Sequence, residues 1–346
     1  MRNFAAQSAD IAQLLLGNYV GRVTENGSVV AADGETCHGD DSGRIAYALA
    51  ALYATQQGDV RLISVPNLID SVALCIAAQF HYNGSDVEGC IYAMMALLTM
   101  GLNLARNAAW SRFQEETQKM ITAWSRKPLQ IKPHQQIFAV IHGIVAYSLG
   151  FTSKDETDRR IDQWLRSRSD NCTGGFMDYS WQGIGGRFDG RAIEHYILLR
   201  EALQRHGNVH TRERRLPTLR THMQRYLRLM PDLVRDDGTN WAYGSTQGCS
   251  GTLNGISFLL YAFVDNWIET TKQAVYVDAL RKLIQHFFMQ YLDQENCCIC
   301  IRDGERNENG ERSTVGINFD AIRQILLWSQ WAKTLKISLD MGNETT

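Results

Sequence analysis

Residues 236–251 form a polar segment that is dense in groups able to bind a hydroxylated ligand. Glycine, hydroxyl and amide residues surround two aromatic rings there, and the segment runs directly into the apolar stretch 252–264. Trp241 offers a flat apolar face, while Asn240 and Tyr243 offer hydrogen-bonding groups. A glycine-rich loop that ends at the start of a helix displays its side chains. The segment therefore predicts a sugar-binding loop, and the simpler alternative is a surface loop with Trp241 in the core.

Side chains that transfer protons or carry positive charge occur in the same kind of loop. β-Elimination on a uronic-acid polysaccharide needs a base near the C5 proton and a group that stabilises the carboxylate as charge develops. Tyr243 and His134 are the candidates for base and acid, and Arg187 and Arg44 are the candidates for holding the carboxylate. A structural role stays open as well, since Tyr243 can pack under its own loop and His134 can cap a helix.

Aspartates in these loops favour a second chemistry. Glycoside hydrolysis requires two carboxyl groups on either side of a glycosidic bond. The candidates are Asp40 or Asp41, Asp178, Asp189 and Asp237. The sequence gives no distances between them, so hydrolysis stays open beside elimination.

A third chemistry is a zinc site. Cys37, His38 and Cys249 lie in predicted loops, and two thiolates with one imidazole leave a zinc position open for a substrate. This set resembles the zinc ligands of lanthionine-synthetase cyclases, which are also α/α toroids, although those ligands occur in the opposite chain order. We expect no metal and no cofactor, with this zinc site as the alternative.

Almost all the elements that must position these loops are predicted to be helices. Apolar residues at spacings of three and four predict about twelve of them. Their ranges are near 3–16, 43–57, 61–81, 85–101, 103–125, 134–150, 153–168, 188–206, 212–230, 251–265, 271–292 and 318–336. Two small β-hairpins are predicted at 18–31, where Asn26-Gly27 forms a turn, and at 297–315.

The predicted helices alternate in character along the chain. Every second one is rich in small and apolar residues, as in 45–52 and 90–98, whereas its neighbours carry charge along one face, as in 112–119 and 155–162. A helix that is apolar all round is enclosed, and a two-faced helix lies outside. Six enclosed helices alternating with six outer ones predict an all-α fold, a single α/α-toroid domain over residues 1–346. An irregular bundle or an open solenoid is the alternative.

In such a toroid the inner helices run in one direction, so the loops before their N-termini meet at one end. Helix N-termini add unpaired N–H groups and positive dipole ends to this rim. We expect the residues that bind substrate to gather there. They are Arg44, Asp41, His38, Tyr179, Trp181, Asn240 and Trp241. The serines and aspartates of these loops also suit ordinary helix caps.

The composition limits which binding partners and which cellular compartment we expect for this chain. The 346 residues carry 35 Lys or Arg against 37 Asp or Glu, so the formal net charge of -2 gives no reason to expect nucleic acid. No apolar window is long enough for a membrane span, and the first residues lack a signal-peptide pattern, so a cytoplasmic location is expected. Secretion after removal of a leader is the alternative. Cys75 and Cys90 lie in apolar helical stretches and are predicted to be buried thiols.

Two segments resemble a known group of enzymes. Asp237-Gly238 and Tyr243-Gly244-Ser245 precede an apolar inner helix, and residues 175–179 form a Gly-Phe-Met-Asp-Tyr segment. Over about residues 170–265 the chain resembles α/α-toroid carbohydrate-active enzymes, a group that includes heparinase- and alginate-lyase-type polysaccharide lyases and unsaturated-uronide hydrolases. The resemblance implies cleavage of an acidic oligo- or polysaccharide.

We therefore expect a polysaccharide lyase that acts by β-elimination, with an oligo- or polysaccharide as its partner and neither nucleic acid nor membrane. Its catalytic residues would come from Tyr243, His134, Asp189, Asp178 and Arg187. The alternatives are a glycoside hydrolase with paired aspartates, a glycan-binding toroid without catalysis, and a zinc-dependent cyclase-like toroid.

Overall fold

The computed structural model describes residues 4–19, 41–55, 65–129, 136–169, 172–173, 176–177, 190–205, 209–240, 248–293, 298–299 and 315–335. The chain divides into two compact units, each described here by itself. Unit 1 comprises Met1–Leu15, Arg168–Ile197 and Leu219–Thr346, and unit 2 comprises Leu16–Ser167 and Leu198–Thr218. A single domain over residues 1–346 stays a prediction.

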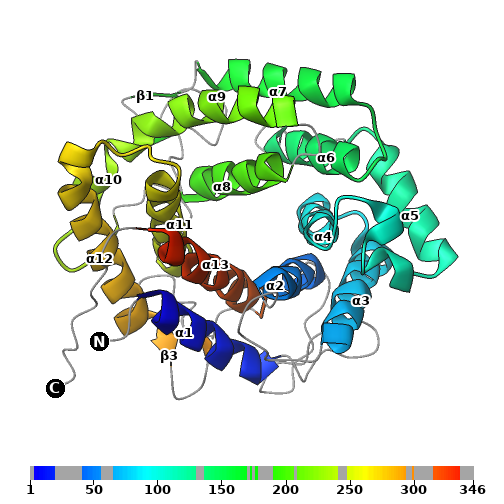
Figure 1. Cartoon of the computed structure of the whole chain (residues 1–346), viewed down its shortest axis with the longest axis horizontal. Coiled ribbons are helices and arrows are strands. Elements are labelled where there is room, and N and C mark those ends of the chain that lie inside the picture. Colours follow the sequence, from blue (N-terminus) through cyan, green and yellow to red (C-terminus); the bar gives the residue numbers. More distant parts are fainter. Residues whose placement is uncertain are drawn as a thin grey trace. The chain divides into compact units, whose positions relative to one another are not determined.

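Unit 2 is built from helices and short 3-10 turns. They are α2 (Asp41–Thr55), α3 (Val65–Asn83), α4 (Val87–Thr99), η2 (Leu104–Arg106), η3 (Trp110–Arg112), α5 (Glu115–Arg126), α6 (Gln136–Ser148) and α7 (Lys154–Ser169). α2 packs on α3 and α4, and α4 packs in turn on α6 (Figure 1). Two further helices, α8 (Gly190–Gln204) and α9 (Val209–Leu227), belong partly to each unit.

Unit 1 combines helices with two very short antiparallel strand pairs. Its elements are α1 (Phe4–Tyr19, mostly in this unit), β1 (Cys172–Thr173), β2 (Phe176–Met177), α10 (Met230–Leu233), α11 (Cys249–Val264), η5 (Thr270–Lys272), α12 (Gln273–Gln290), β3 (Leu292–Asp293), β4 (Cys298–Ile299) and α13 (Val315–Thr334). β1 pairs with β2, and β3 pairs with β4. α11 packs against α12 and α13 (Figure 1).

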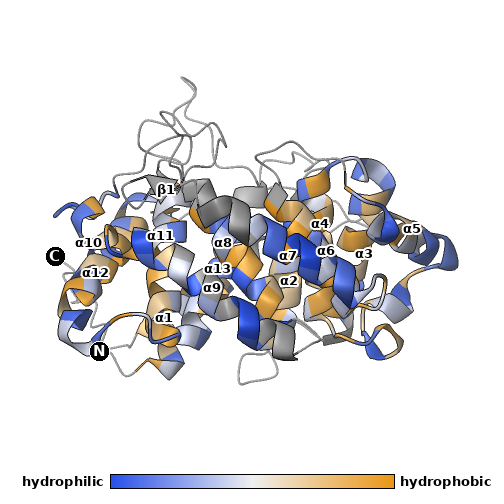
Figure 2. Ribbon diagram, turned by 90° about the horizontal axis from the view of Figure 1, so that it is seen from above, coloured by the Kyte–Doolittle hydropathy of each residue, from blue (hydrophilic) through white to orange (hydrophobic). Residues whose placement is uncertain are grey.

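Enclosed and outer helices alternate in both units, as the sequence predicts. Every residue from Gly89 to Leu98 of α4 is buried, and so is every residue from Gly251 to Phe263 of α11. α5, by contrast, buries only Thr117, Ile121 and Ser125, and α7 is largely hydrophilic in Figure 2. Burial on all sides explains the small and apolar composition of the enclosed helices. No helix within the described ranges is both long and apolar enough to cross a membrane.

α2 and α4 approach each other closely at their first turns. A Cβ atom added to Gly43 would lie 2.0 Å from the carbonyl oxygen of Gly89, so only glycine fits at position 43. Gln79 of α3 supports this contact, because its Oε1 atom accepts a hydrogen bond of 3.0 Å from the Gly43 N–H. The two enclosed helices therefore begin side by side, which is the arrangement predicted for a common rim.

One predicted helix, at 103–125, is only half helical. Its first part forms the 3-10 turns η2 and η3, and α5 begins at Glu115. Asn107 causes the difference, because its Oδ1 atom accepts hydrogen bonds from the N–H groups of Ala109 (3.1 Å) and Trp110 (3.0 Å). Its Nδ2 atom donates to the carbonyls of Leu97 and Gly101. A buried asparagine that binds four backbone groups holds the chain in turns where apolar spacing predicts a helix.

The predicted hairpins are only partly described. α1 continues to Tyr19, and residues 20–31 of the first hairpin lie outside the described residues. In the second, β4 pairs with β3 at 292–293, a stretch that was expected to end a helix. Asn318 fixes β4, because its Oδ1 atom accepts a 2.7 Å hydrogen bond from the Ile299 N–H. Residues 300–314 lie outside the described part of the chain, and the pair of β1 with β2 was not predicted.

Three thiols are buried within the described helices. Cys75 and Cys90 are fully buried in unit 2, as predicted, and Cys249 is buried at the start of α11 in unit 1. Burial raises the pKa of Cys75 to about 12. Burial and the nearby carboxylate of Asp86 raise the pKa of Cys90 to about 12. Both thiols of unit 2 are therefore protonated and unreactive at neutral pH.

His142 is a buried histidine on α6. Its side chain lies edge-on to the Trp124 ring, with 4.9 Å between ring centres. No described residue offers either ring nitrogen a well-placed hydrogen bond. Burial, helped by the positive charge of Arg160, lowers the pKa of His142 to about 4, although the backbone of Trp124 and Ser125 acts in the opposite direction. His142 is therefore neutral in the folded protein at pH 7.

Replacing Gly43 with alanine should destabilise the protein by about 1–3 kcal/mol, because the added methyl group collides with backbone that cannot move aside. Gly143→Ala on α6 is the matched control. Its Cβ atom would meet nothing closer than 3.6 Å, and the better helix propensity of alanine should stabilise by about 0.5–1 kcal/mol. Denaturant unfolding measures both changes. Equal effects of the two substitutions would refute the close approach of α2 and α4.

The pKa of His142 predicts acid sensitivity. Unfolding raises the pKa of His142 from about 4 to 6.5, so the unfolded chain binds one more proton between these pH values. The contribution of His142 to stability is present above pH 6.5 and is lost as the pH falls towards 4, by about 3 kcal/mol in total. His142→Leu should flatten this part of the stability curve in denaturant unfolding from pH 4 to 7. Parallel curves for the two proteins would contradict the assignment.

Candidate functional site

A cation lies where α2 and α4 begin together in unit 2. Arg44, in the first turn of α2, forms an ion pair with Glu88 in the first turn of α4. Its guanidinium carbon lies 4.5 Å from the centre of the Tyr92 ring, and Nη1 donates a 3.4 Å hydrogen bond to the Tyr92 hydroxyl. The side chains of Arg44 and Glu88 remain 21% and 23% exposed. Arg44, predicted to bind substrate, is therefore held in a fixed orientation within reach of solvent.

The contacts continue inward from Arg44 to a buried carboxylate. Tyr47 lies one turn further along α2, and its ring centre is 6.2 Å from that of Tyr92. The Tyr47 hydroxyl donates a hydrogen bond to Glu201 of α8. Tyr47 and Glu201 are both almost completely buried. Glu88, Arg44, Tyr92, Tyr47 and Glu201 thus form a continuous series, called here the arginine cluster, which joins α2, α4 and α8.

Helix dipoles stabilise the carboxylate of the arginine cluster and destabilise its cation. A carboxylate is favoured in the first turn of a helix, where Glu88 lies, and Asp86 caps the same helix by accepting from the N–H groups of Glu88 and Gly89. A cation in a first turn is disfavoured by the dipole, so Arg44 depends on Glu88 and on the Tyr92 ring. A guanidinium at a helix start can pair with the carboxylate of a ligand.

A second polar cluster joins α11 and α13 in unit 1. Ser257 donates a 2.6 Å hydrogen bond to Gln324 and accepts a 2.7 Å bond from the indole N–H of Trp328. The Nε2 atom of Gln324 donates to Asn254 (3.4 Å) and to Asp320 (2.8 Å). Asn254 and Ser257 of α11 contact residues of α13 in the same order along the chain, Gln324 and then Trp328. These two enclosed helices are therefore also parallel. Asp320 lies near the start of α13.

The polar turn before α11 is described as far as Asn240. Asp237 accepts hydrogen bonds from the backbone N–H (2.9 Å) and the hydroxyl (2.6 Å) of Thr239, and these bonds lower the pKa of its exposed carboxyl group. Asp237 therefore stays ionised and is unsuited as a general acid. Asn240 lies against Gly255 of α11. Its buried Oδ1 atom accepts no hydrogen bond from a described residue, so it can receive a donor.

Most of the predicted site lies outside the described residues. This holds for Tyr243, His134, Asp189, Asp178, Arg187, His38, Tyr179, Trp181 and Trp241, and also for Asp40. Asp41 is the first residue of α2, and its side chain is not among the described ones. Arg44 and Asn240 are thus the two predicted binding residues that can be placed, one in each unit.

The zinc alternative remains a prediction. Cys249 is a buried free thiol at the first position of α11, while Cys37 and His38 lie outside the described residues. Within the described part of the chain, no group of three His, Cys, Asp or Glu side chains is placed to hold a metal ion.

Sequence reasoning missed most residues of the two clusters. Helical spacing was the signal that could have found them, because polar residues inside apolar helices recur at intervals of three or four. Arg44 and Tyr47 are three apart, Glu88 and Tyr92 are four apart, and Asp320 and Gln324 are four apart. Glu201 could be found only from the structure, since its partner Tyr47 is distant in sequence.

Comparisons with known proteins establish the fold. A scan against protein-family models gives no match, and a search of curated proteins gives no significant match. Among solved structures, the chain is similar to a glycoside hydrolase of family 105 from C. acetobutylicum, with a TM-score of 0.59 and 13% identity over 94% of this chain and 99% of that one. It is also similar to a sugar epimerase from a ruminal bacterium, with a TM-score of 0.60 and 12% identity over 93% and 99% of the two chains.

A polysaccharide lyase is a further structural relative. Its TM-score is 0.54 at 10% identity, over 96% of this chain and 99% of that one. These similarities confirm the predicted fold class, an all-α α/α toroid, and the structural resemblance to carbohydrate-active toroids. At such low identity the likeness concerns the fold, and the chemistry has to be argued from the site.

Proposed function

We propose that this chain is a carbohydrate-active enzyme that cleaves an acidic oligo- or polysaccharide by β-elimination. The observation that carries the proposal is the position of Arg44, a partly exposed cation held by Glu88 and Tyr92 where two enclosed helices begin. A guanidinium binds a carboxylate through parallel N–H donors, and a uronic acid supplies such a carboxylate. Structural similarity to a hydrolase, an epimerase and a lyase that act on sugars supports a saccharide ligand.

The reaction assigns a separate task to each group. A base removes the C5 proton of the uronic acid, the bond between C4 and the glycosidic oxygen breaks, and a double bond forms between C4 and C5. An acid returns a proton to the leaving oxygen. Negative charge develops on the uronate carboxylate in the transition state, where a preorganised cation is most effective. Arg44 takes this task in the proposal, with Arg187 as a second candidate, and Tyr243 and His134 are the candidates for proton transfer.

Hydrolysis is the second candidate function. The similarity to a family 105 glycoside hydrolase favours it, as do the aspartates of the predicted loops. The lowered pKa of Asp237 argues against a role as proton donor, so the candidates for that role are Asp40 or Asp41, Asp178 and Asp189. Asp237 remains a candidate for the ionised member of the carboxyl pair. Trp181 and Trp241 would stack on sugar rings in either reaction.

Ultraviolet absorbance separates these functions. The full chain should be incubated with a panel of uronic-acid glycans while the absorbance of conjugated C4–C5 double bonds and the number of new reducing ends are followed. Elimination should raise both together. New reducing ends without a rise in absorbance, or a fall in absorbance on unsaturated oligosaccharides, would establish hydrolysis instead. Binding without either change would leave a glycan-binding protein and overturn the enzymatic proposal.

Arg44→Gln tests the role of the cation. Loss of a charged hydrogen bond to the uronate should lower kcat/KM on the best glycan of that panel about 10- to 100-fold, because such bonds contribute about 1.5–3 kcal/mol. The penalty should disappear on the carboxyl-reduced form of the same glycan. Arg281→Gln, which removes an exposed arginine paired with Asp278 on α12, is the matched control. An Arg44 variant that loses thermal stability but keeps its preference for the uronate would show a purely structural arginine.

A further inference from the structure

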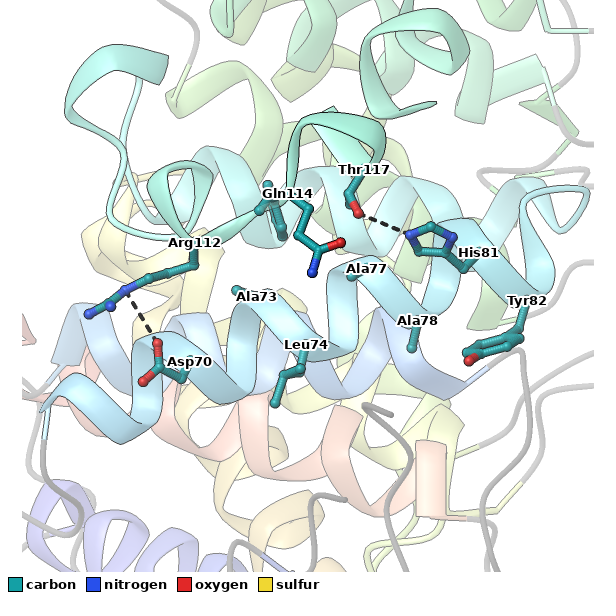
Figure 3. Close-up of a pocket in the computed structure, with 11 residues that line it drawn as sticks. Asp70, Ala73, Leu74, Ala77, Ala78, His81, Tyr82, Arg112, Gln114 and Thr117 are labelled. Carbon is teal, nitrogen blue, oxygen red and sulfur yellow. Dashed lines mark hydrogen bonds and ion pairs between the residues drawn. The ribbon is translucent and has the colours of Figure 1, made fainter. Parts of the chain in front are cut away.

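A groove of about 660 Å³ runs along the outer side of α3 in unit 2 (Figure 3). Its floor is formed by small side chains of α3, including Ala73 and Ala77, which lie four residues apart and so share one helix face. The opposite wall comes from η3 and the start of α5, where Phe113 is buried behind the groove. None of the residues selected from the sequence as catalytic or substrate-binding lines it.

An exposed aromatic ring marks one end of the groove. Tyr82 is 71% exposed, although an aromatic side chain of this size is usually largely covered. It lies at the C-terminal end of α3, four residues before Asp86, which caps α4. A flat ring presented to solvent beside a concave surface can stack on the apolar face of a pyranose.

Polar side chains line the rest of the groove and offer both donors and acceptors. The Gln114 amide points into it (Figure 3), and although Gln114 is the N-cap residue of α5, its side chain does not cap that helix. At the end opposite Tyr82, Arg112 Nε lies 3.2 Å from Asp70 Oδ1. His81 Nε2 lies 2.9 Å from the hydroxyl of Thr117. Planar groups that donate and accept at once suit the hydroxyls of a sugar.

The charges of the groove select a neutral ligand. Arg112 and Asp70 neutralise each other while both remain about half exposed, at 47% and 49%. An anion would face Asp70 and a cation would face Arg112, so either would lose part of its attraction, whereas hydroxyl groups can bind both partners of the pair. From Asp70 to Tyr82 the helix rises about 18 Å, which matches a short chain of sugars better than a single ring.

We propose that this groove binds a neutral oligosaccharide, with Tyr82 stacking on one sugar and Gln114 and the Asp70–Arg112 pair binding hydroxyls further along the chain. The groove is separate from the arginine cluster and requires no carboxylate on its ligand. It goes beyond the proposed elimination and does not depend on it. A neutral glycan cannot undergo that reaction without a uronic acid, so binding in the groove and catalysis can be measured apart.

Calorimetric titration of the full chain with neutral hexasaccharides tests the proposal. Xylohexaose, cellohexaose, mannohexaose and maltohexaose are the probes, with a uronic-acid hexasaccharide beside them. At least one neutral hexaose should bind, Tyr82→Ala should weaken it about tenfold or more, and Gln114→Ala should weaken it about threefold to tenfold. Tyr82→Phe should retain the affinity, because it keeps the ring. Met289→Ala, which removes another highly exposed side chain on α12, should change nothing.

Three results would overturn the proposal. The first is the absence of heat with every neutral hexaose at millimolar concentration. The second is binding that survives both Tyr82→Ala and Gln114→Ala, which would place the glycan elsewhere. The third is self-association of the chain, seen in sedimentation, that Tyr82→Ala abolishes, because the groove would then be a contact between copies. The fate of the elimination assay bears on none of the three, since the neutral probes contain no uronic acid.

Discussion

The backbone contact between Gly43 and Gly89 is the constraint on which the arrangement of unit 2 most depends. Two helices whose first turns touch cannot slide past each other without a collision, so their side chains meet in one register. That register brings Arg44 to Glu88 and to the Tyr92 ring, and sets Tyr47 one turn deeper. The positions of the charged groups therefore follow from a contact between two residues that carry no side chain.

Unit 1 fixes its parallel helices by a different means. Hydrogen bonds join α11 to α13 through Ser257, Gln324 and Trp328, all of which are buried. A buried polar network stabilises one arrangement only when its members are satisfied, because an unpaired buried group costs about 1–3 kcal/mol. Asn240, on the same side of α11 as Gly255, keeps one buried acceptor without a described donor. That atom sets the turn before α11 apart from the hydrogen-bonded network between α11 and α13.

Helical periodicity was sufficient to predict the alternating layers, because a helix that is buried on all sides consists mainly of small and apolar residues. It failed at 103–125, where a single side chain, that of Asn107, binds backbone groups and outweighs the apolar spacing. The pairing of β3 with β4 was equally hidden, since it depends on a hydrogen bond from Ile299 to Asn318 of α13. Local patterns report which face of a helix is buried, but they do not report which distant atoms it meets.

The same limit applied to the candidate site. Loop composition directed attention to residues before the helices, and Arg44 was found in this way. Glu88, Tyr92 and Glu201 were missed, because each lies inside a helix whose average character is apolar. The groove that Tyr82 borders is lined by α3, η3 and the start of α5. Polar clusters can therefore lie inside enclosed helices as well as in glycine-rich loops.

Each unit contains at least one buried thiol whose chemical modification can report local unfolding of that unit. Cys75 and Cys90 belong to unit 2 and Cys249 to unit 1, and none of the three is reached by solvent in the folded state. An alkylating reagent can modify them only when the surrounding helices separate, so the rate of modification at each position records how often that separation occurs. Mass spectrometry of the native chain would then show whether the two units open together or independently.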